Sequence, residues 1–392
     1  MPEKISTSLD VETAVRDRYS AASQAAEPAL CCPVQYQPQY LEVLPQELID
    51  RDYGCGDPSR YVKEGETVLD LGSGGGKICY IASQIVGPQG SVIGVDMNDE
   101  MLGLARQYQE EIAARVGWSN VRFHKAKIQD LAFDLDRWES HLQKTPVDSA
   151  STWLEALDTA QNWREESPLI PDDSIDVVLS NCVLNLVRPE DRLQLFAELH
   201  RVLRRGGRAV ISDIVCDEPV PKHLQNNPEL WSGCISGAFV EDAFLRAFEA
   251  AGFYGVEIVV RQEEPWAVIE GIEFRSLTVQ AYKGKDGPCM DHHQAVIYKG
   301  PWKSVTDDDG HVLHRGVRTA VCEKTFQIYT RDPYGEQVVP VPPAKAVSSQ
   351  QAQSFQCSPA QVRDPKQTKG AAAGSLTVLP VEDCCGPSGD CC

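Results

Sequence analysis

The feature that most constrains the fold is a regular alternation of apolar and amphipathic runs that begins at Thr67. Strand-like runs such as TVLDLG, SVIGVD, VRFHKA, SIDVVLS and RAVISDI are separated by helix-like runs such as KICYIASQIV and PEDRLQLFAELHRVL. Parallel strands need a crossover connection, which is usually a helix. The alternation therefore predicts an α/β fold with a parallel, doubly wound sheet.

The length of 392 residues exceeds one typical core, so we expect more than one structural segment. We predict a helical segment at 1–60, a core domain at 61–285, a small α+β unit at 286–335 and a disordered tail at 336–392. The tail prediction follows from a composition that is rich in Pro, Ser, Gln and Ala. Residues 132–171 are acidic, contain tryptophan and break the alternation, which predicts an inserted, partly helical segment.

A glycine-rich turn in VLDLGSGGGK separates the first strand from its helix. Gly72, Gly74 and Gly76 have no side chain there, so the backbone can approach a ligand closely. About twenty residues later Asp96 ends the second strand, where a carboxylate accepts hydrogen bonds from ribose hydroxyls. The alternative is a turn that serves only helix packing, but the turn and the later acid together favour a nucleotide site.

The residues around this turn favour S-adenosylmethionine over a dinucleotide. Lys77 stands where the dinucleotide motif has its third glycine, and Asp70 precedes the turn, where a carboxylate attracts the amino group of a methionine moiety and repels a pyrophosphate. The segment LHRVLRRGGRAVISD resembles class I S-adenosylmethionine-dependent methyltransferases, which have a Rossmann-like sheet. We further predict that Met97, Ile128 and Asn181 contact this cofactor.

Three cysteines are predicted to converge above the carboxyl edge of the sheet. Cys55 lies between glycines in YGCGDP, Cys182 ends the fourth strand in SNCVLNL, and Cys234 follows the fifth strand in SGC. Converging thiols serve as a zinc site, as a redox couple or as ligands of a soft, thiophilic species. Zinc is the poorest fit because no C-x-x-C pair is present.

Fourteen cysteines are many for a protein of a reducing compartment, where they are mostly free thiols. We interpret Cys79, Cys216 and Cys322 as small buried core residues. His292 and His293 are adjacent, so in a strand they point to opposite faces and do not form a metal pair. The tail cysteines either collect a thiophilic substrate or are dispensable; they are Cys384, Cys385, Cys391 and Cys392.

Together, YGCGD, VLDLGSGGGK, GVDMNDEML, SNCVLNL and NNPELWSGCISGA resemble the arsenite S-adenosylmethionine methyltransferases, from about Val15 to about Gly335. The resemblance implies methylation of trivalent arsenic, with Cys182 and Cys234 as arsenic ligands. It also implies that Cys55 joins a disulfide relay with a cysteine nearer the N-terminus. That position falls on Cys31 or Cys32, and we favour Cys32.

This resemblance sets the expected chemistry and its partners. Thiolates hold trivalent arsenic and leave its lone pair free for in-line attack on the sulfonium methyl group. The transfer oxidises arsenic, and two electrons from cysteines restore the trivalent product and leave a disulfide. The expected substrates are arsenite or its thiol conjugates, and the expected reductant is a thiol such as glutathione or thioredoxin, in arsenic detoxification.

Three other functions stay open at this point. The first is methylation of a small organic molecule, which would need a base near the donor; the second is a thiol-rich metal buffer; the third is a nicotinamide oxidoreductase. The net charge of −20 argues against nucleic acid or anionic lipid as a partner. The N-terminus has no apolar signal region and no run is long enough to span a membrane, so we expect a cytoplasmic protein. Nothing in the sequence suggests an obligate oligomer, so we expect a monomer.

Overall fold

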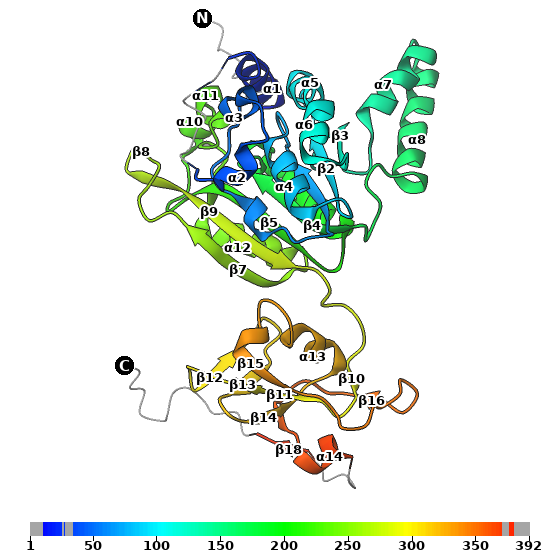
Figure 1. Ribbon diagram of the computed structural model, residues 1–392, viewed down its shortest axis with the longest axis vertical. Helices are drawn as coiled ribbons and strands as arrows, with labels where there is room; N and C mark the ends of the chain where they lie inside the picture. The colour runs from blue at the N-terminus through cyan, green and yellow to red at the C-terminus, as the bar shows by residue number, and fades with distance from the viewer. Residues whose placement is uncertain (1–10, 26, 28–33, 371–375, 380–392) are drawn as a thin grey trace, which may run out of the picture. The chain divides into compact units, whose positions relative to one another are not determined.

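The computed structural model describes residues 11–25, 27, 34–370 and 376–379 (Figure 1). The chain divides into two compact units, Met1–Gly284 and Lys285–Cys392. We describe each unit by itself. Within the described residues, every helix is too short or too polar to cross a membrane.

The first unit is built on a nine-stranded sheet, of which seven strands follow in the order β3-β2-β1-β4-β5-β9-β7. The first five are parallel, whereas β9 is antiparallel to β5 and to β7. Their bounds are β1 Thr67–Leu71, β2 Ser91–Asp96, β3 Val121–Lys125, β4 Ile175–Asn181, β5 Leu203–Cys216, β7 Tyr254–Arg261 and β9 Ile272–Tyr282. The prediction of a doubly wound α/β sheet is confirmed.

The central strands are apolar along their whole length because helices cover both faces of the sheet. Six of the seven residues of β4 are buried. Val177 and Leu179 pack into the core on the side of helix α4, while Val178 packs on the opposite side with helices α9 and α12. The helices that flank the sheet are α4 Lys77–Val86, α5 Asp99–Gln107, α6 Gln109–Val116, α9 Arg192–Val202 and α12 Glu241–Ala250.

The inserted segment forms two helices, α7 Leu135–Lys144 and α8 Ala150–Glu166. The Trp138 and Trp163 rings meet edge to face at 5.7 Å between centroids, and Phe133 lies against both. Arg164 of α8 forms an ion pair with Asp130 at 2.8 Å. These contacts attach the insertion near the carboxyl end of β3.

Helix α1, Val11–Ala22, belongs to the first unit and packs against short helix α11, Pro228–Ser232. Arg18 of α1 donates hydrogen bonds to the Glu229 carbonyl at 2.7 Å and to the Ser232 hydroxyl at 2.9 Å. The N-terminal helix is thereby joined to the segment that leads into Cys234.

The second unit contains a five-stranded antiparallel sheet in the order β15-β11-β14-β17-β18. Its strands are β11 Ala295–Tyr298, β14 Arg318–Ala320, β15 Val338–Val341, β17 Gln361–Val362 and β18 Thr377–Val378. Two strand pairs add to it, β10 Met290–Asp291 with β16 Gln353–Ser354, and β12 Ser304–Thr306 with β13 Val312–His314. The helices are α13 Glu323–Tyr329 and α14 Pro365–Lys369.

The prediction of a disordered tail from residue 336 is wrong for the part that the structure describes. Strands β15 and β17 lie in this region, and Arg363 is fully buried. Its guanidinium donates to both carboxylate oxygens of Asp291, at 2.7 and 3.0 Å. The composition was misleading because strand pairing and this ion pair, rather than a long apolar run, order the segment. The four tail cysteines lie outside the described residues.

Candidate functional site

A cavity opens at the carboxyl ends of β1, β2 and β4, which is where ligands bind in open α/β sheets. Eight of the residues predicted to form the site line it: Asp70, Gly72, Gly74, Asp96, Met97, Ile128, Asn181 and Cys182. Helix α1 contributes Glu12 and Tyr19 to the same wall. Seven of the eight predicted cofactor residues and one predicted arsenic ligand therefore share one cavity.

The glycine turn is needed for close packing as well as for ligand access. Gly72 has φ +68°, and a Cβ there would lie 2.5 Å from a methyl carbon of Val183, in the loop that carries Cys182. Gly76 has φ +85° at the N-cap of α4, and a Cβ would lie 2.8 Å from the Phe123 ring. Gly76 was predicted to contact the cofactor, but it is not among the residues that line the cavity. It serves as the N-cap of α4.

Asp70 places a buried carboxylate in the cavity wall. It is 2% exposed, and burial raises its pKa to about 7, opposed by a hydrogen bond from the Cys79 thiol at 3.2 Å. The nearby carboxylates of Asp52 and Asp96 add to this rise in the pKa. A cationic amino group at this carboxylate would offset the cost of burying its charge, so the residue fits the ammonium of S-adenosylmethionine.

Asp96 ends β2 and stabilises the glycine turn from across the cavity. Its carboxylate accepts hydrogen bonds from the backbone N–H of Gly74 at 2.8 Å and of Asn98 at 2.9 Å. Burial raises the pKa of Asp96, and these two bonds oppose the shift. A carboxylate has about four acceptor positions, so it can still accept from a ribose diol. Met97 and Ile128 add apolar side chains to the lining of the same cavity.

Lys77, which stands in place of a third glycine, is buried in an ion pair. Its ammonium lies 2.5 Å from the Asp52 carboxylate and 3.9 Å from the centre of the Tyr36 ring. Both partners come from the segment before β1. Lys77 therefore ties the N-terminal segment to the start of α4.

The structure brings Cys55, Cys182 and Cys234 together at the edge of this cavity. Cys55 and Cys182 form a disulfide with Cα atoms 5.8 Å apart, and the Cys234 thiol donates to the Cys182 carbonyl at 3.2 Å. All three are buried in one apolar cluster. The disulfide joins a residue predicted for the relay to a residue predicted as an arsenic ligand. Cys32 lies outside the described residues.

Cys182 and Cys234 share an unusual backbone conformation, because both have φ +62°. Non-glycine residues seldom adopt this left-handed region, and those that do concentrate at functional sites. The backbone N–H of Cys182 donates to the Ser212 carbonyl at 2.8 Å, which holds the loop against β5. The structure thus maintains a strained backbone at both predicted arsenic ligands.

Asn181 holds the Cys55 loop against the end of β4. Its side-chain oxygen accepts from the backbone N–H of Cys55 at 2.9 Å and of Gly56 at 3.0 Å, and its amide donates to the Gly56 carbonyl at 2.8 Å. The residue lines the cavity, but these bonds face the thiols. Its cofactor contact stays a prediction, and its observed contacts position Cys55.

Sequence reasoning missed Asp213, a fully buried carboxylate on β5. One of its oxygens lies within 4.8 Å of the sulfur atoms of Cys55 and Cys182. It accepts from the Asn185 side chain at 2.8 Å, and burial raises its pKa to about 7. Arg192 opposes that shift. The sequence signal that could have identified it is the position of Asp213 in the strand RAVISD, where an acidic residue ends an apolar run.

The other two cysteines that the structure describes in the first unit belong to the core. Cys79 lies inside α4 beside Asp70, and the Cys216 thiol donates to the Phe239 carbonyl at 3.3 Å. Both are fully buried. Cys322, interpreted as core filling, lies in the second unit next to two other cysteines.

Comparison with known proteins decides between the remaining functions. An arsenite methyltransferase of Aquipseudomonas alcaligenes is 30% identical over 76% of this chain and 80% of its own length. The chain belongs to the arsenite methyltransferase family. A mouse member is 27% identical over 92% of this chain and 87% of its own length. The resemblance inferred from the five motifs is confirmed.

Structural comparison agrees. The crystal structure of an arsenic(III) S-adenosylmethionine methyltransferase from Chlamydomonas reinhardtii has a TM-score of 0.53 and 25% identity, with 85% of this chain and all of that chain covered. A methyltransferase domain model matches residues 62–151 and 155–252. A domain of unknown function, DUF8838, matches residues 285–373. The enzyme is thus a class I methyltransferase that uses S-adenosylmethionine.

Proposed function

We propose that this chain methylates trivalent arsenic held by the thiolates of Cys182 and Cys234, and that Cys55 couples the reaction to a disulfide relay. The observation that carries the proposal is the meeting of the three thiols at the rim of the cavity that contains Asp70 and Asp96. Scattered core cysteines have no reason to gather there in strained backbone conformations.

The substrate can bind only after the Cys55–Cys182 disulfide is reduced. A thiol reductant such as glutathione or thioredoxin then frees Cys182, whose neighbour Cys234 already points its thiol at the Cys182 backbone. Each thiol replaces one hydroxide of arsenite, so that an As–S bond forms and one water leaves. This exchange moves no electrons, and it leaves the arsenic lone pair free.

The cofactor, when bound, supplies an electrophilic methyl group. Asp70 would pair with its amino group, Asp96 would accept from its ribose, and Met97 and Ile128 would flank its base. The apolar cluster around the thiols excludes water, and the loop after β4 fixes where arsenic must lie. The arsenic lone pair would form the As–C bond as the bond between the methyl carbon and the sulfonium sulfur breaks; S-adenosylhomocysteine would leave, and arsenic would become pentavalent.

The relay returns arsenic to the trivalent state. Cys55 loses its proton and attacks the sulfur of Cys182, so that the Cys55–Cys182 disulfide forms as the As–S bond to Cys182 breaks. The electron pair of that As–S bond stays on arsenic and reduces it. Cys32 then attacks the Cys55 sulfur, releases Cys182 as a thiolate and forms a new disulfide that the external thiol reduces. Cys55 is the shared member of both disulfides. We place this chemistry in the cytoplasm of an arsenic-detoxifying cell, with the chain acting as a monomer.

The two α1 side chains in the cavity wall are poor candidates for the base that an organic methyl acceptor would need. Burial raises the pKa of Tyr19 well above its ordinary value, and the neighbouring Cys234 adds to the shift, so Tyr19 is a neutral phenol. Glu12 accepts from the Lys127 ammonium through both carboxylate oxygens at 2.8 Å. Neither side chain of the α1 wall offers a free base.

The test is to incubate the full chain with arsenite, S-adenosylmethionine and glutathione and to separate the arsenic species by chromatography. The wild type and Gly103→Ala, in which the added methyl group meets open space, should both form methylated arsenic. Cys182→Ser should form none. Equal methylation by Cys182→Ser would refute the assignment of the arsenic ligand.

A further inference from the structure

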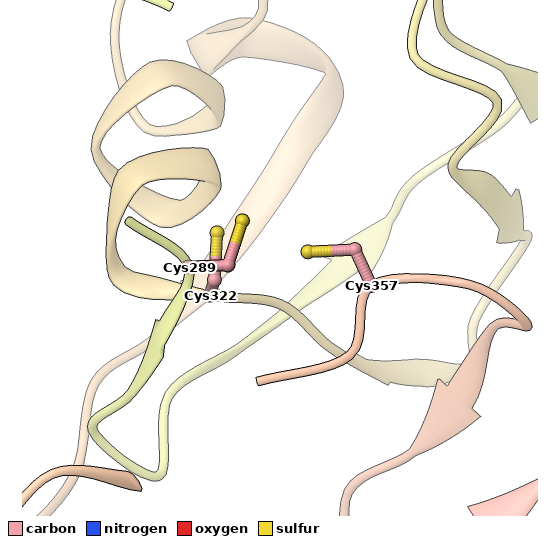
Figure 2. Close-up of side chains that lie close together, drawn as sticks. All are labelled: Cys289, Cys322 and Cys357. Carbon is pink, nitrogen blue, oxygen red and sulfur yellow. The ribbon is translucent and has the colours of Figure 1, made fainter. Parts of the chain in front are cut away.

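The second unit contains three cysteines whose sulfur atoms all lie within 4.8 Å of one another. Cys289 precedes β10, Cys322 lies between β14 and α13, and Cys357 follows β16. Figure 2 shows the Cys357 sulfur directed toward the sulfur atoms of Cys289 and Cys322. The three thiols come from distant parts of the sequence, so the fold of this unit brings them together.

Backbone pairing holds the three segments in place. Strands β10 and β16 are antiparallel, with Met290 opposite Ser354, and the Phe355 N–H donates to the Cys289 carbonyl at 2.9 Å. Cys322 is fully buried, whereas Cys289 and Cys357 are half-buried. The trio therefore has one closed side and one side that an ion can reach.

The surroundings suit bound sulfur ligands. The Thr325 N–H lies 3.4 Å from the Cys322 sulfur and donates to it, and the Thr325 hydroxyl lies 3.1 Å from the same atom. Ala320, Phe355 and Leu376 pack around the thiols. A donor aimed at one sulfur within an otherwise apolar pocket favours a sulfur that carries negative charge.

We propose that Cys289, Cys322 and Cys357 form a second arsenic site, which binds inorganic arsenite through three sulfur atoms and is separate from the thiols that hold arsenic for methyl transfer. Three convergent sulfur atoms match the three bonds of pyramidal trivalent arsenic. Zinc prefers four protein ligands in structural sites, and no His, Asp or Glu joins the trio among the described residues. The choice of arsenic rests on the proposed function.

The binding reaction balances without a redox step. Each thiol gives its sulfur to arsenic, and its proton leaves with the displaced hydroxide, so three As–S bonds form and three waters leave. Zinc instead requires thiolates and releases protons as it binds. A monomethylated arsenical has only two exchangeable positions and cannot fill the site.

The test uses the full chain in a background that lacks the other arsenic ligands. Cys31, Cys32, Cys55, Cys182, Cys234 and the four tail cysteines are changed to Ser, and arsenite alone is the probe, without S-adenosylmethionine. We expect about one arsenic per chain after gel filtration, with three sulfur neighbours in X-ray absorption. Cys357→Ser should weaken arsenite binding roughly tenfold or more and leave two sulfur neighbours, whereas Cys216→Ser should bind like the background.

Cys357→Ser is the preferred variant because the residue is half-buried in a loop, and far-UV circular dichroism establishes that the chain still folds. Cys289→Ser, also half-buried, is the second variant and should lose binding equally. Absence of bound arsenic in the background, or binding by either variant as strong as that of the background, overturns the proposal. So does stoichiometric zinc with four ligands when Zn²⁺ alone is the probe. Methylation by the unmodified chain is measured separately, so failure of this site and failure of the proposed function are distinguishable.

Discussion

The side-chain oxygen of Asn181 lies 2.9 Å from the backbone nitrogen of Cys55, which donates to it. The bond joins the end of β4 to a loop 126 positions earlier in the sequence and places Cys55 opposite Cys182. It links the cofactor cavity with the disulfide, because Asn181 lines one and holds the other.

We predict that Asn181→Ala slows repeated turnover more than the first turnover. Loss of the side chain leaves the N–H groups of Cys55 and Gly56 without this acceptor, at a cost of about 1–3 kcal/mol. Cys55 then meets Cys182 less often, so the Cys55–Cys182 disulfide forms slowly. This step follows methyl transfer, so the first methyl transfer itself is less affected. Rapid-mixing and steady-state measurements of methylated arsenic separate the two rates. Asn181→Asp keeps the acceptor and should be less impaired; equal loss in both phases would contradict the positioning role.

Gly54→Ala should also slow disulfide formation between Cys55 and Cys182, because Gly54 packs against the Asn181 side chain. A Cβ on Gly54 would overlap the side-chain amide of Asn181, so one of the two must move. We expect slower disulfide formation between Cys55 and Cys182, followed by thiol titration after reduction and air oxidation. Gly103→Ala, which meets open space, is the matched control. An unchanged oxidation rate in Gly54→Ala would show that the close packing has no part in the relay.

Binding of S-adenosylmethionine should strengthen as pH rises toward 7. Burial raises the pKa of Asp70 to about 7, so below that pH the carboxyl holds a proton that a cationic ligand must displace. Affinity should therefore fall by up to about tenfold for each pH unit below 7 and level off above it. Calorimetry in buffers of different ionisation enthalpy detects the released proton. Asp70→Asn should bind weakly at every pH; a pH dependence retained in that variant would assign it to another group.

Loss of the Asp291 carboxylate, which forms the ion pair with Arg363, should destabilise the second unit. Arg363 is fully buried against Asp291, and an uncompensated buried charge costs about 3–5 kcal/mol. Asp291→Asn should therefore lower the protection of the second unit in hydrogen exchange. Asp242→Asn breaks an exposed pair with Arg246 on α12 and should have little effect. Similar protection in both variants would mean that the buried pair does not hold this unit together.

The sheet was predictable because each strand and helix signal is local, and the carboxyl-edge rule then brought Asp70, Asp96 and Cys182 to one cavity. The contacts of Asn181 with the Cys55 loop were not predictable, since they depend on residues far apart in the sequence. Asp213 was missed because its role comes from burial beside the thiols. Cys357 was assigned to a disordered tail because its segment is polar, although pairing with β10 orders it.

The most direct measurement is a single turnover of reduced enzyme with arsenite and S-adenosylmethionine in the absence of any external reductant. We predict one methylated trivalent arsenic per chain and one new disulfide that contains Cys55, which mass spectrometry of alkylated peptides locates. Methylated arsenic formed without oxidation of Cys55 would contradict it, because arsenic would then have been restored by electrons from another source.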